Sequence, residues 1–165
     1  MRKDFSNYLE YFNEFTLWQY VFPGMKINNN IIPCNSLELY LANLFKDEAV
    51  IDFTKFQDRL IQECFIPSDI AQVVTFLIWF QSFNPEKVME FFSKRNGYKG
   101  SRNPITDELL QEWISIDGLT DNMFSAFIGY RPTTSSQELM SRGLKGRELG
   151  EEIKRLEIEK FKQLI

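Results

Sequence analysis

The sequence predicts an all-α protein, because its apolar residues recur at helical spacing and no stretch alternates polar and apolar residues long enough for a strand. Capping residues, prolines and glycines separate these apolar stretches at regular intervals, which is a second indication of helices. The composition indicates a core for these helices and excludes disorder, since 44% of the 165 residues are hydrophobic and Phe alone occurs 16 times. We therefore expect an array of about nine helices with a substantial apolar core and no sheet.

Four of these helices are expected in the first half of the chain. The most apolar, Ile70–Phe83, follows the capping pair Ser68 and Asp69. It is apolar on nearly every side, so we expect it at the centre of a bundle. Asn35 and Glu38 form the capping box of another. In chain order, the four helices are expected over residues 5–22 (ended by Pro23 and Gly24), over 37–45, from Asp52 or Thr54 to Pro67, and over 70–83.

Five further helices are expected in the second half. Asn84, Pro85 and Glu86 form a helix start, with a cap, a proline at the first position and an acid in the first turn. Ser135 and Glu138 form another capping box. The five helices are expected from residue 85 to Gly97, over 107–116 after the cap Thr106, from the cap Thr120 to about Tyr130, from Ser135 to Arg142, and from the 146–150 segment to Leu164.

The residue types exclude several classes of enzyme. The chain has no histidine, so it holds no Ser-His-Asp or Cys-His nucleophile and no histidine-ligated metal. It has no Asp-x-Asp pair, and Glu157 and Glu159 would point to nearly opposite sides of a helix. We therefore expect no catalytic residue and no metal-binding residue in this chain.

The cysteines and the apolar runs indicate the cellular compartment of the protein. Cys34 and Cys64 form no CxxC motif and are expected to be buried thiols of a reducing compartment, with a single disulfide as the alternative. Acidic residues follow Met1 where a secretory signal would be apolar, and the run Val73–Phe80 is too short to cross a bilayer. A cytoplasmic protein without a membrane partner is expected.

The charge is unevenly distributed along the chain. The net charge is −4, which is not the signature of a generally basic nucleic-acid binder. Residues 1–130 carry 11 Lys or Arg against 17 Asp or Glu, whereas residues 131–165 carry 8 against 6. The last fifth of the chain is therefore where an anion is expected to bind.

The first candidate phosphate site is the basic segment of residues 94–102. It contains Lys94, Arg95, Lys99 and Arg102, no acidic residue, and Tyr98, which could stack on a base. The alternative is a helix C-terminus with the basic residues that the helix dipole favours, followed by a solvated loop.

The second candidate is the segment of residues 141–150. One helix ends at Gly143 and another begins about three residues later, which would place free N–H groups beside Lys145 and Arg147. Gly146 and Gly150, four residues apart, would leave one helix face open to close approach. The alternative is a tight packing corner between two helices. With Lys154 added, the full set of expected RNA-phosphate contacts is Lys94, Arg95, Lys99, Arg102, Arg142, Lys145, Arg147 and Lys154.

Residues 138–157 resemble the C-terminal signature of the bacterial-type CCA-adding tRNA nucleotidyltransferase and poly(A) polymerase family. Gly143, Gly146 and Gly150 match the glycines of that signature, and Arg147 replaces its usual proline. Residues 8–23 resemble the helix that follows the neck of the same family. The two matches bracket nearly the whole chain.

The resemblance implies a helical neck and body over residues 1–130 and a helical tail over residues 131–165. The family's catalytic head, with its Asp-x-Asp motif, has no counterpart here. The resemblance thus implies a tRNA-binding half, subunit or fragment, that positions the acceptor stem and elbow for a head supplied by another chain. Mg²⁺ and CTP or ATP would belong to that head, and this chain would carry no cofactor. The alternative is a non-catalytic helical module, derived from the same fold, that binds other proteins.

Overall fold

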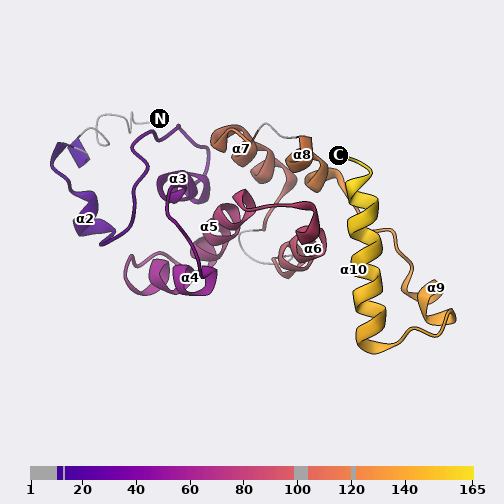
Figure 1. The fold of residues 1–165 in the computed structure, drawn as a ribbon. Coiled ribbons are helices and arrows are strands. Elements are labelled where there is room, and N and C mark those ends of the chain that lie inside the picture. The colour runs from indigo at the N-terminus through magenta and orange to yellow at the C-terminus, as the bar shows by residue number, and fades with distance from the viewer. Residues whose placement is uncertain (1–10, 13, 99–103, 120–121) are drawn as a thin grey trace. The chain divides into compact units, whose positions relative to one another are not determined.

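The computed structural model describes residues 11–12, 14–98, 104–119 and 122–165, and across these ranges it confirms the predicted all-α class. Figure 1 shows the helices, and no strand occurs among the residues just given. The helices are α2 (Trp18–Val21), α3 (Leu37–Phe45), α4 (Phe53–Gln62), α5 (Ser68–Gln81), the 3-10 helix η1 (Pro85–Lys87), α6 (Val88–Gly97), α7 (Asp107–Asp117), α8 (Asn122–Gly129), α9 (Ser136–Ser141) and α10 (Gly146–Lys162).

The chain divides into two compact units, Met1–Gln81 and Ser82–Ile165, and each is described by itself. The first unit contains α2 to α5, and the second contains η1 and α6 to α10. The tail-like region expected over residues 131–165 lies in the second unit, together with residues 82–130.

The apolar helix α5 forms the centre of the first unit. Both α3 and α4 pack against it, and every residue from Val73 to Phe80 is buried. The central position predicted for this helix is therefore confirmed within the unit. Neither α5 nor any other helix in the described ranges combines the length and the apolar character needed to cross a membrane.

The first predicted helix, over residues 5–22, is not continuous in the part of the chain that can be described. Tyr11, Phe12 and Glu14 are helical, but a turn follows, in which Thr16 adopts a φ of 51°. Only the four residues of α2 resume the helix. The spacing of apolar residues is retained through the break, which explains why the sequence pattern does not reveal it. Residues 5–10 and 13 lie outside the described ranges.

Several helix starts follow the predicted caps, and two differ by a few residues. Thr106 accepts a hydrogen bond from the N–H of Leu109 at 3.2 Å, as expected. The cap of α3 is Ser36, which accepts from Leu39 N–H at 3.2 Å, so the prediction of Asn35 is wrong by one residue. Ser68 and Asp69 lie within the first turn of α5 and do not precede it. The sequence left Asp52 and Thr54 as alternative starts of α4, and the structure shows Asp52 as its cap.

Buried asparagines hold the loop before α3 against that helix. Asn28 donates from Nδ2 to the carbonyl of Asn43 at 3.0 Å and to its Oδ1 at 3.1 Å. The backbone N–H of Asn28 donates to the carbonyl of Leu44 at 2.8 Å. These bonds satisfy polar groups that would otherwise be costly to bury, and they fix the course of the loop.

Arg59 of α4 secures the start of the same loop. Its Nη2 donates to the carbonyl of Pro23 at 2.8 Å, and its Nη1 pairs with Glu48 at 3.4 Å. Glu48 in turn accepts from the backbone N–H of Lys26 at 2.6 Å. Between them, Gly24 has a φ of +67°, which explains a glycine at this turn.

Aromatic rings form the core of the second unit. The ring of Phe127 on α8 lies 4.0 Å from Phe83 and 4.3 Å from Phe161 on α10, centroid to centroid. Phe91 on α6 lies 5.6 Å from Phe127. Helix α10 packs against α6, η1 and α9, and α7 packs against α8. The many phenylalanines of the sequence thus serve largely as core.

The two cysteines are free thiols, but the expectation that they are buried is wrong. Both Cys34 and Cys64 are partly exposed. The thiol of Cys34 donates to the carbonyl of Ile32 at 2.9 Å. Partial burial raises the pKa of the Cys64 thiol, and the charge of Arg59 offsets part of that effect.

Candidate nucleic-acid interface

The second candidate site is built on the corner between α9 and α10. Ser135 caps α9 by accepting from the N–H of Glu138 at 3.4 Å, as the sequence predicts. After α9 the chain reverses through Gly143, which has a φ of 94°, and α10 begins at Gly146, which has a φ of 53°. Both glycines lie in the left-handed region, so the backbone of the corner requires them.

These glycines do not serve tight packing. Apart from the adjacent residues and the backbone of the same helix, no atom of the described residues lies within 4 Å of a Cβ placed on Gly143, Gly146 or Gly150. Gly150 is helical and has no positive φ, so neither the backbone of this chain nor its described neighbours require a glycine there. The packing-corner alternative therefore does not account for Gly150.

The N-terminus of α10 is open to a ligand. Lys145 is its N-cap residue, and none of the described side chains caps this end of the helix. The first turn includes one acid, Glu148. Its negative charge interacts favourably with the helix dipole but repels an incoming anion. Lys145 itself is exposed.

The cations of this segment differ in how they are paired. Arg142 pairs with Glu138 at 2.5 Å, and Arg147 pairs with Glu151 at 2.6 Å. Lys145 and Lys154 are both exposed, and neither forms an ion pair with any residue the structure describes. Arg147 is 91% exposed, so its pair with Glu151 is solvated and weak.

Arg147, Gly150 and Lys154 lie on one face of α10, because residues three, four and seven apart share a helix face. The two cations therefore flank Gly150, a position that lacks a side chain. Arg142 is separate from this group. It lies near Glu152, whose pKa is lowered first by its hydrogen bond from Arg155 and to a lesser extent by the charge of Arg142.

A buried acid attaches the other end of α10 to the second unit. The side chain of Glu157 is 0% exposed and accepts hydrogen bonds from the hydroxyl of Tyr130 at 2.6 Å and from the backbone N–H groups of Thr133 at 3.1 Å and Thr134 at 2.6 Å. Lys160 lies 3.6 Å from its carboxylate. Burial alone would raise the pKa of Glu157, but the bonds from Thr134, Tyr130 and Thr133 outweigh it and lower the pKa.

The first candidate segment is only partly described, because Lys99 and Arg102 lie outside the described ranges. Lys94 and Arg95 end α6, as the dipole alternative expects. Lys94 lies 3.9 Å from Glu90 on the same helix. The guanidinium group of Arg95 already makes two hydrogen bonds within the protein. It donates from Nε to the carbonyl of Ile105 at 3.2 Å and from Nη2 to Asp107 at 2.5 Å.

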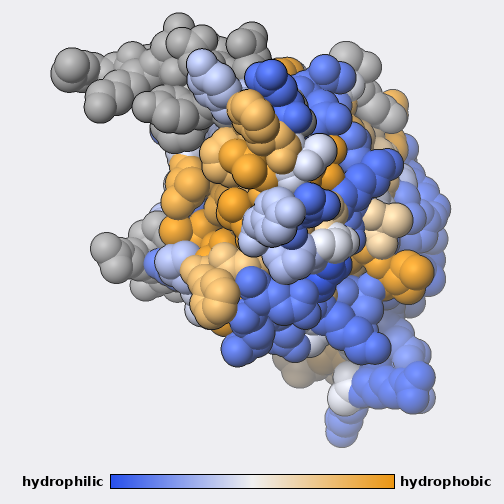
Figure 2. Space-filling view, turned by 90° about the vertical axis from the view of Figure 1, so that its left-hand side faces the viewer, coloured by the Kyte–Doolittle hydropathy of each residue, from blue (hydrophilic) through white to orange (hydrophobic). Residues whose placement is uncertain are grey.

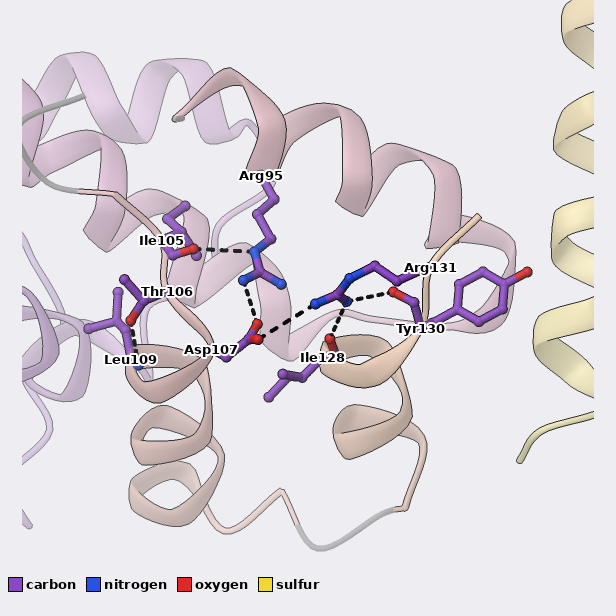
Figure 3. A network of polar contacts seen from close by, with 8 residues as sticks. All are labelled: Arg95, Ile105, Thr106, Asp107, Leu109, Ile128, Tyr130 and Arg131. Carbon is purple, nitrogen blue, oxygen red and sulfur yellow. Dashed lines mark hydrogen bonds and ion pairs between the residues drawn. The ribbon is translucent and has the colours of Figure 1, made fainter. Parts of the chain in front are cut away.

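Arg131 joins Arg95 at the same carboxylate, which the sequence patterns did not reveal. In Figure 3 the two guanidinium groups approach Asp107 from different elements, Arg95 from α6 and Arg131 from the segment after α8. Arg131 Nη2 lies 3.6 Å from the Asp107 carboxylate, and its Nη1 donates to the carbonyls of Ile128 at 2.6 Å and Tyr130 at 2.7 Å. The only local signal for the pairing of Arg131 with Asp107 was that Arg131 is a basic residue just beyond the end of α8.

In the described ranges, no group of three or more Cys, Asp or Glu side chains is placed to hold a metal ion. Comparisons of the chain with protein families, with curated proteins and with solved structures find no match.

Proposed function

We propose that this chain binds the acceptor stem and elbow of tRNA and positions the tRNA for a catalytic head supplied by another chain. The observation that carries the proposal is the face of α10 on which Arg147 and Lys154 flank Gly150. A phosphate can approach the helix backbone closely at Gly150, and a cation lies one turn away on either side. Lys145, at the open start of the helix, extends the same positive region.

This arrangement is suited to duplex RNA. The edges of bases in an A-form helix are largely hidden, so proteins recognise such a helix through its shape, phosphates and 2′-hydroxyl groups. Phosphate contacts position a protein on the nucleic acid without reading its sequence. The resemblance of residues 138–157 to the C-terminal signature of the tRNA nucleotidyltransferase family supports tRNA as the RNA. Addition of CMP and AMP would then belong to the head, with its Asp-x-Asp motif and Mg²⁺.

The experiment replaces Lys145 and Lys154 by Glu in one chain and measures tRNA binding by fluorescence anisotropy over a range of salt concentrations. Loss of two phosphate contacts should weaken binding and flatten the dependence of log K on log salt by about 0.7–0.9 per contact. The effect should be similar for different tRNAs, because phosphate contacts carry no sequence information.

The matched control carries the same change of charge in the first unit, Lys26→Glu with Lys55→Glu, at two other exposed lysines. It should leave the salt slope nearly unchanged. Equal slopes for the two double variants would mean that the binding is a general charge effect, and unchanged tRNA binding by the α10 variant would contradict the proposal. Thermal unfolding of both variants checks that the fold is retained.

A second candidate function is protein binding, which exposed aromatic residues in the first unit favour. Tyr11 and Phe15 are each 58% exposed and Tyr20 is 76% exposed. Figure 2 views the molecule from the side on which α2 lies in Figure 1 and shows apolar surface gathered there. Such a patch is typical of an interaction surface. Concentration-dependent association in size-exclusion chromatography that is lost in Phe15→Ser with Tyr20→Ser would favour this function; a monomer at all concentrations would not.

A further inference from the structure

A pocket of about 340 Å³ lies in the second unit, beside the C-terminal end of α6 and apart from the α10 face. This volume is at the small end of the range of roughly 300–1,000 Å³ that is usual for small-molecule sites. Four of its lining residues are apolar: Phe92, Pro104, Ile105 and Pro132. Of these, Phe92 and the two prolines offer rigid ring surfaces to a planar group.

The polar part of the lining is cationic. Arg95 and Arg131 both line the pocket, and no acidic side chain is among its lining residues. Asp107 pairs with both guanidinium groups and so balances one of their two charges (Figure 3). One positive charge is left for a ligand.

Hydrogen-bond donors of both arginines remain available within the described part of the chain. The bonds of Arg95 use its Nε and Nη2. Arg131 donates from Nη1, and its Nη2 lies 3.6 Å from Asp107, so Nη1 of Arg95 and Nε of Arg131 are the nitrogens left without a described partner. Bonds to Ile105, Ile128 and Tyr130 carbonyls hold the two guanidinium groups in place before any ligand arrives. The side chain of Arg131 is 59% exposed, so its free donors can reach a ligand. A guanidinium fork fixed in this way is suited to the oxygens of a phosphate.

We propose that this pocket binds one nucleotide, with the phosphate on Arg131 and Arg95 and the base against the apolar wall that includes Phe92. Aromatic and apolar surfaces bind bases by their faces and tolerate any base, so the pocket is not expected to select among them strongly. The nucleotide is a free nucleoside monophosphate or one unpaired nucleotide of an RNA strand, since both present the same chemistry. The proposal is independent of the α10 face and holds whether or not the chain binds tRNA.

The test titrates the full-length chain with AMP, adenosine and inorganic phosphate by isothermal titration calorimetry. AMP should bind, and each of its two parts should bind at least about tenfold more weakly, because the pocket recognises both. A short single-stranded RNA that binds at least tenfold more tightly than AMP would identify the RNA strand as the source of the nucleotide; equal or weaker binding would identify the free nucleotide. Failure of AMP and of the RNA to bind at millimolar concentration would overturn the proposal.

Two variants of lining residues test whether AMP binds in this pocket. Arg131→Gln removes the exposed cation, and Asn96→Glu adds a negative charge at an exposed position of the lining. Each should weaken AMP binding by about tenfold or more, the first through loss of charge-assisted hydrogen bonds. Arg155→Gln removes a 53% exposed arginine that belongs to neither the pocket nor the α10 face, and this variant should bind AMP as the unaltered chain does. If Arg131→Gln proves unstable, Asn96→Glu alone decides, and unchanged AMP affinity in that variant would contradict the proposal.

Discussion

The hydroxyl of Tyr130 donates a hydrogen bond to Oε2 of Glu157 at 2.6 Å, and both residues are buried. Tyr130 ends the α8 region, and Glu157 lies 27 residues later on α10. Burial first, and then the bond to the carboxylate, raises the pKa of Tyr130, which therefore keeps its proton. The pair, with Thr133 and Thr134, fastens α10 to the aromatic core, which positions the face that carries Arg147 and Lys154.

Replacement of Glu157 should be among the most destabilising changes in the second unit. Glu157→Ala leaves two backbone N–H groups and a tyrosine hydroxyl without their acceptor, and we expect a loss of about 3–5 kcal/mol in the free energy of unfolding. Urea denaturation followed by circular dichroism measures this loss. Glu159→Ala, at a solvated acid two residues along, should cost less than about 1 kcal/mol. Similar losses for the two variants would show that the buried network contributes little.

The stability due to Glu157 should depend on pH in a defined direction. Its pKa is lowered in the folded state, so its contribution is complete above the unfolded pKa of about 4.3 and is lost as the pH falls through the folded pKa. The difference in unfolding free energy between the unaltered chain and Glu157→Gln should be constant near neutral pH and shrink below about pH 4.3. Denaturation curves from pH 7 to pH 3 test this. A difference that instead grows on acidification would mean that the folded pKa is raised.

Gly150→Ala should change stability and RNA binding in opposite directions. Nothing lies within 4 Å of a Cβ at this position, and alanine is favoured over glycine in a helix by about 1 kcal/mol. We therefore expect a more stable protein. If a phosphate approaches the helix at Gly150, the added methyl group should nevertheless weaken tRNA binding. Thermal unfolding and anisotropy on the same preparation measure both effects, and unchanged tRNA affinity would show that the RNA does not approach the helix there.

Phe65 has an unfavourable, left-handed backbone conformation. A substitution that removes its steric cost should stabilise the first unit. Its φ is 54° and the residue is 86% exposed, so glycine would remove the steric cost without loss of buried contacts. Phe65→Gly should raise the free energy of unfolding by about 1 kcal/mol. Phe65→Ala is the control, because alanine keeps the steric cost of this conformation. Equal stability of the two variants would indicate that the backbone conformation is not the cause.

Local signals predicted much of the fold, whereas contacts between distant residues could not be predicted. The caps at Thr106 and Ser135 act within three residues, so the sequence alone revealed them. The shift from Asn35 to Ser36 reflects two neighbouring residues that are both good caps, between which only the geometry decides. The positive φ of Thr16 interrupts a helix whose apolar spacing continues, so the pattern concealed the break.

The candidate site was predicted in outline only. Spacing placed Arg147, Gly150 and Lys154 on one helix, and their shared face follows from helical geometry. The occupation of Arg95 by Asp107, 12 residues away, and the arrival of Arg131 at the same carboxylate depend on how α6, α7 and α8 pack. No local pattern encodes that packing. The expectation that Glu157 and Glu159 point apart is confirmed, since one side chain is buried and the other is 54% exposed.

The buried residues of α10 lie near its C-terminal end, so the two halves of the helix should differ in local stability. Its two buried residues, Glu157 and Phe161, lie in its last six positions, and Lys162 pairs with Glu86 at 2.6 Å near the same end. The first half of α10 has no buried residue. The short helix α9 precedes it in the chain. Amide hydrogens around Arg147–Lys154 should therefore exchange with solvent through local openings of low free energy, while those near Phe161 should exchange only when the second unit unfolds. We therefore expect the segment that carries the basic face to adjust to a bound RNA more readily than the C-terminal end of α10, which is buried against the rest of the second unit.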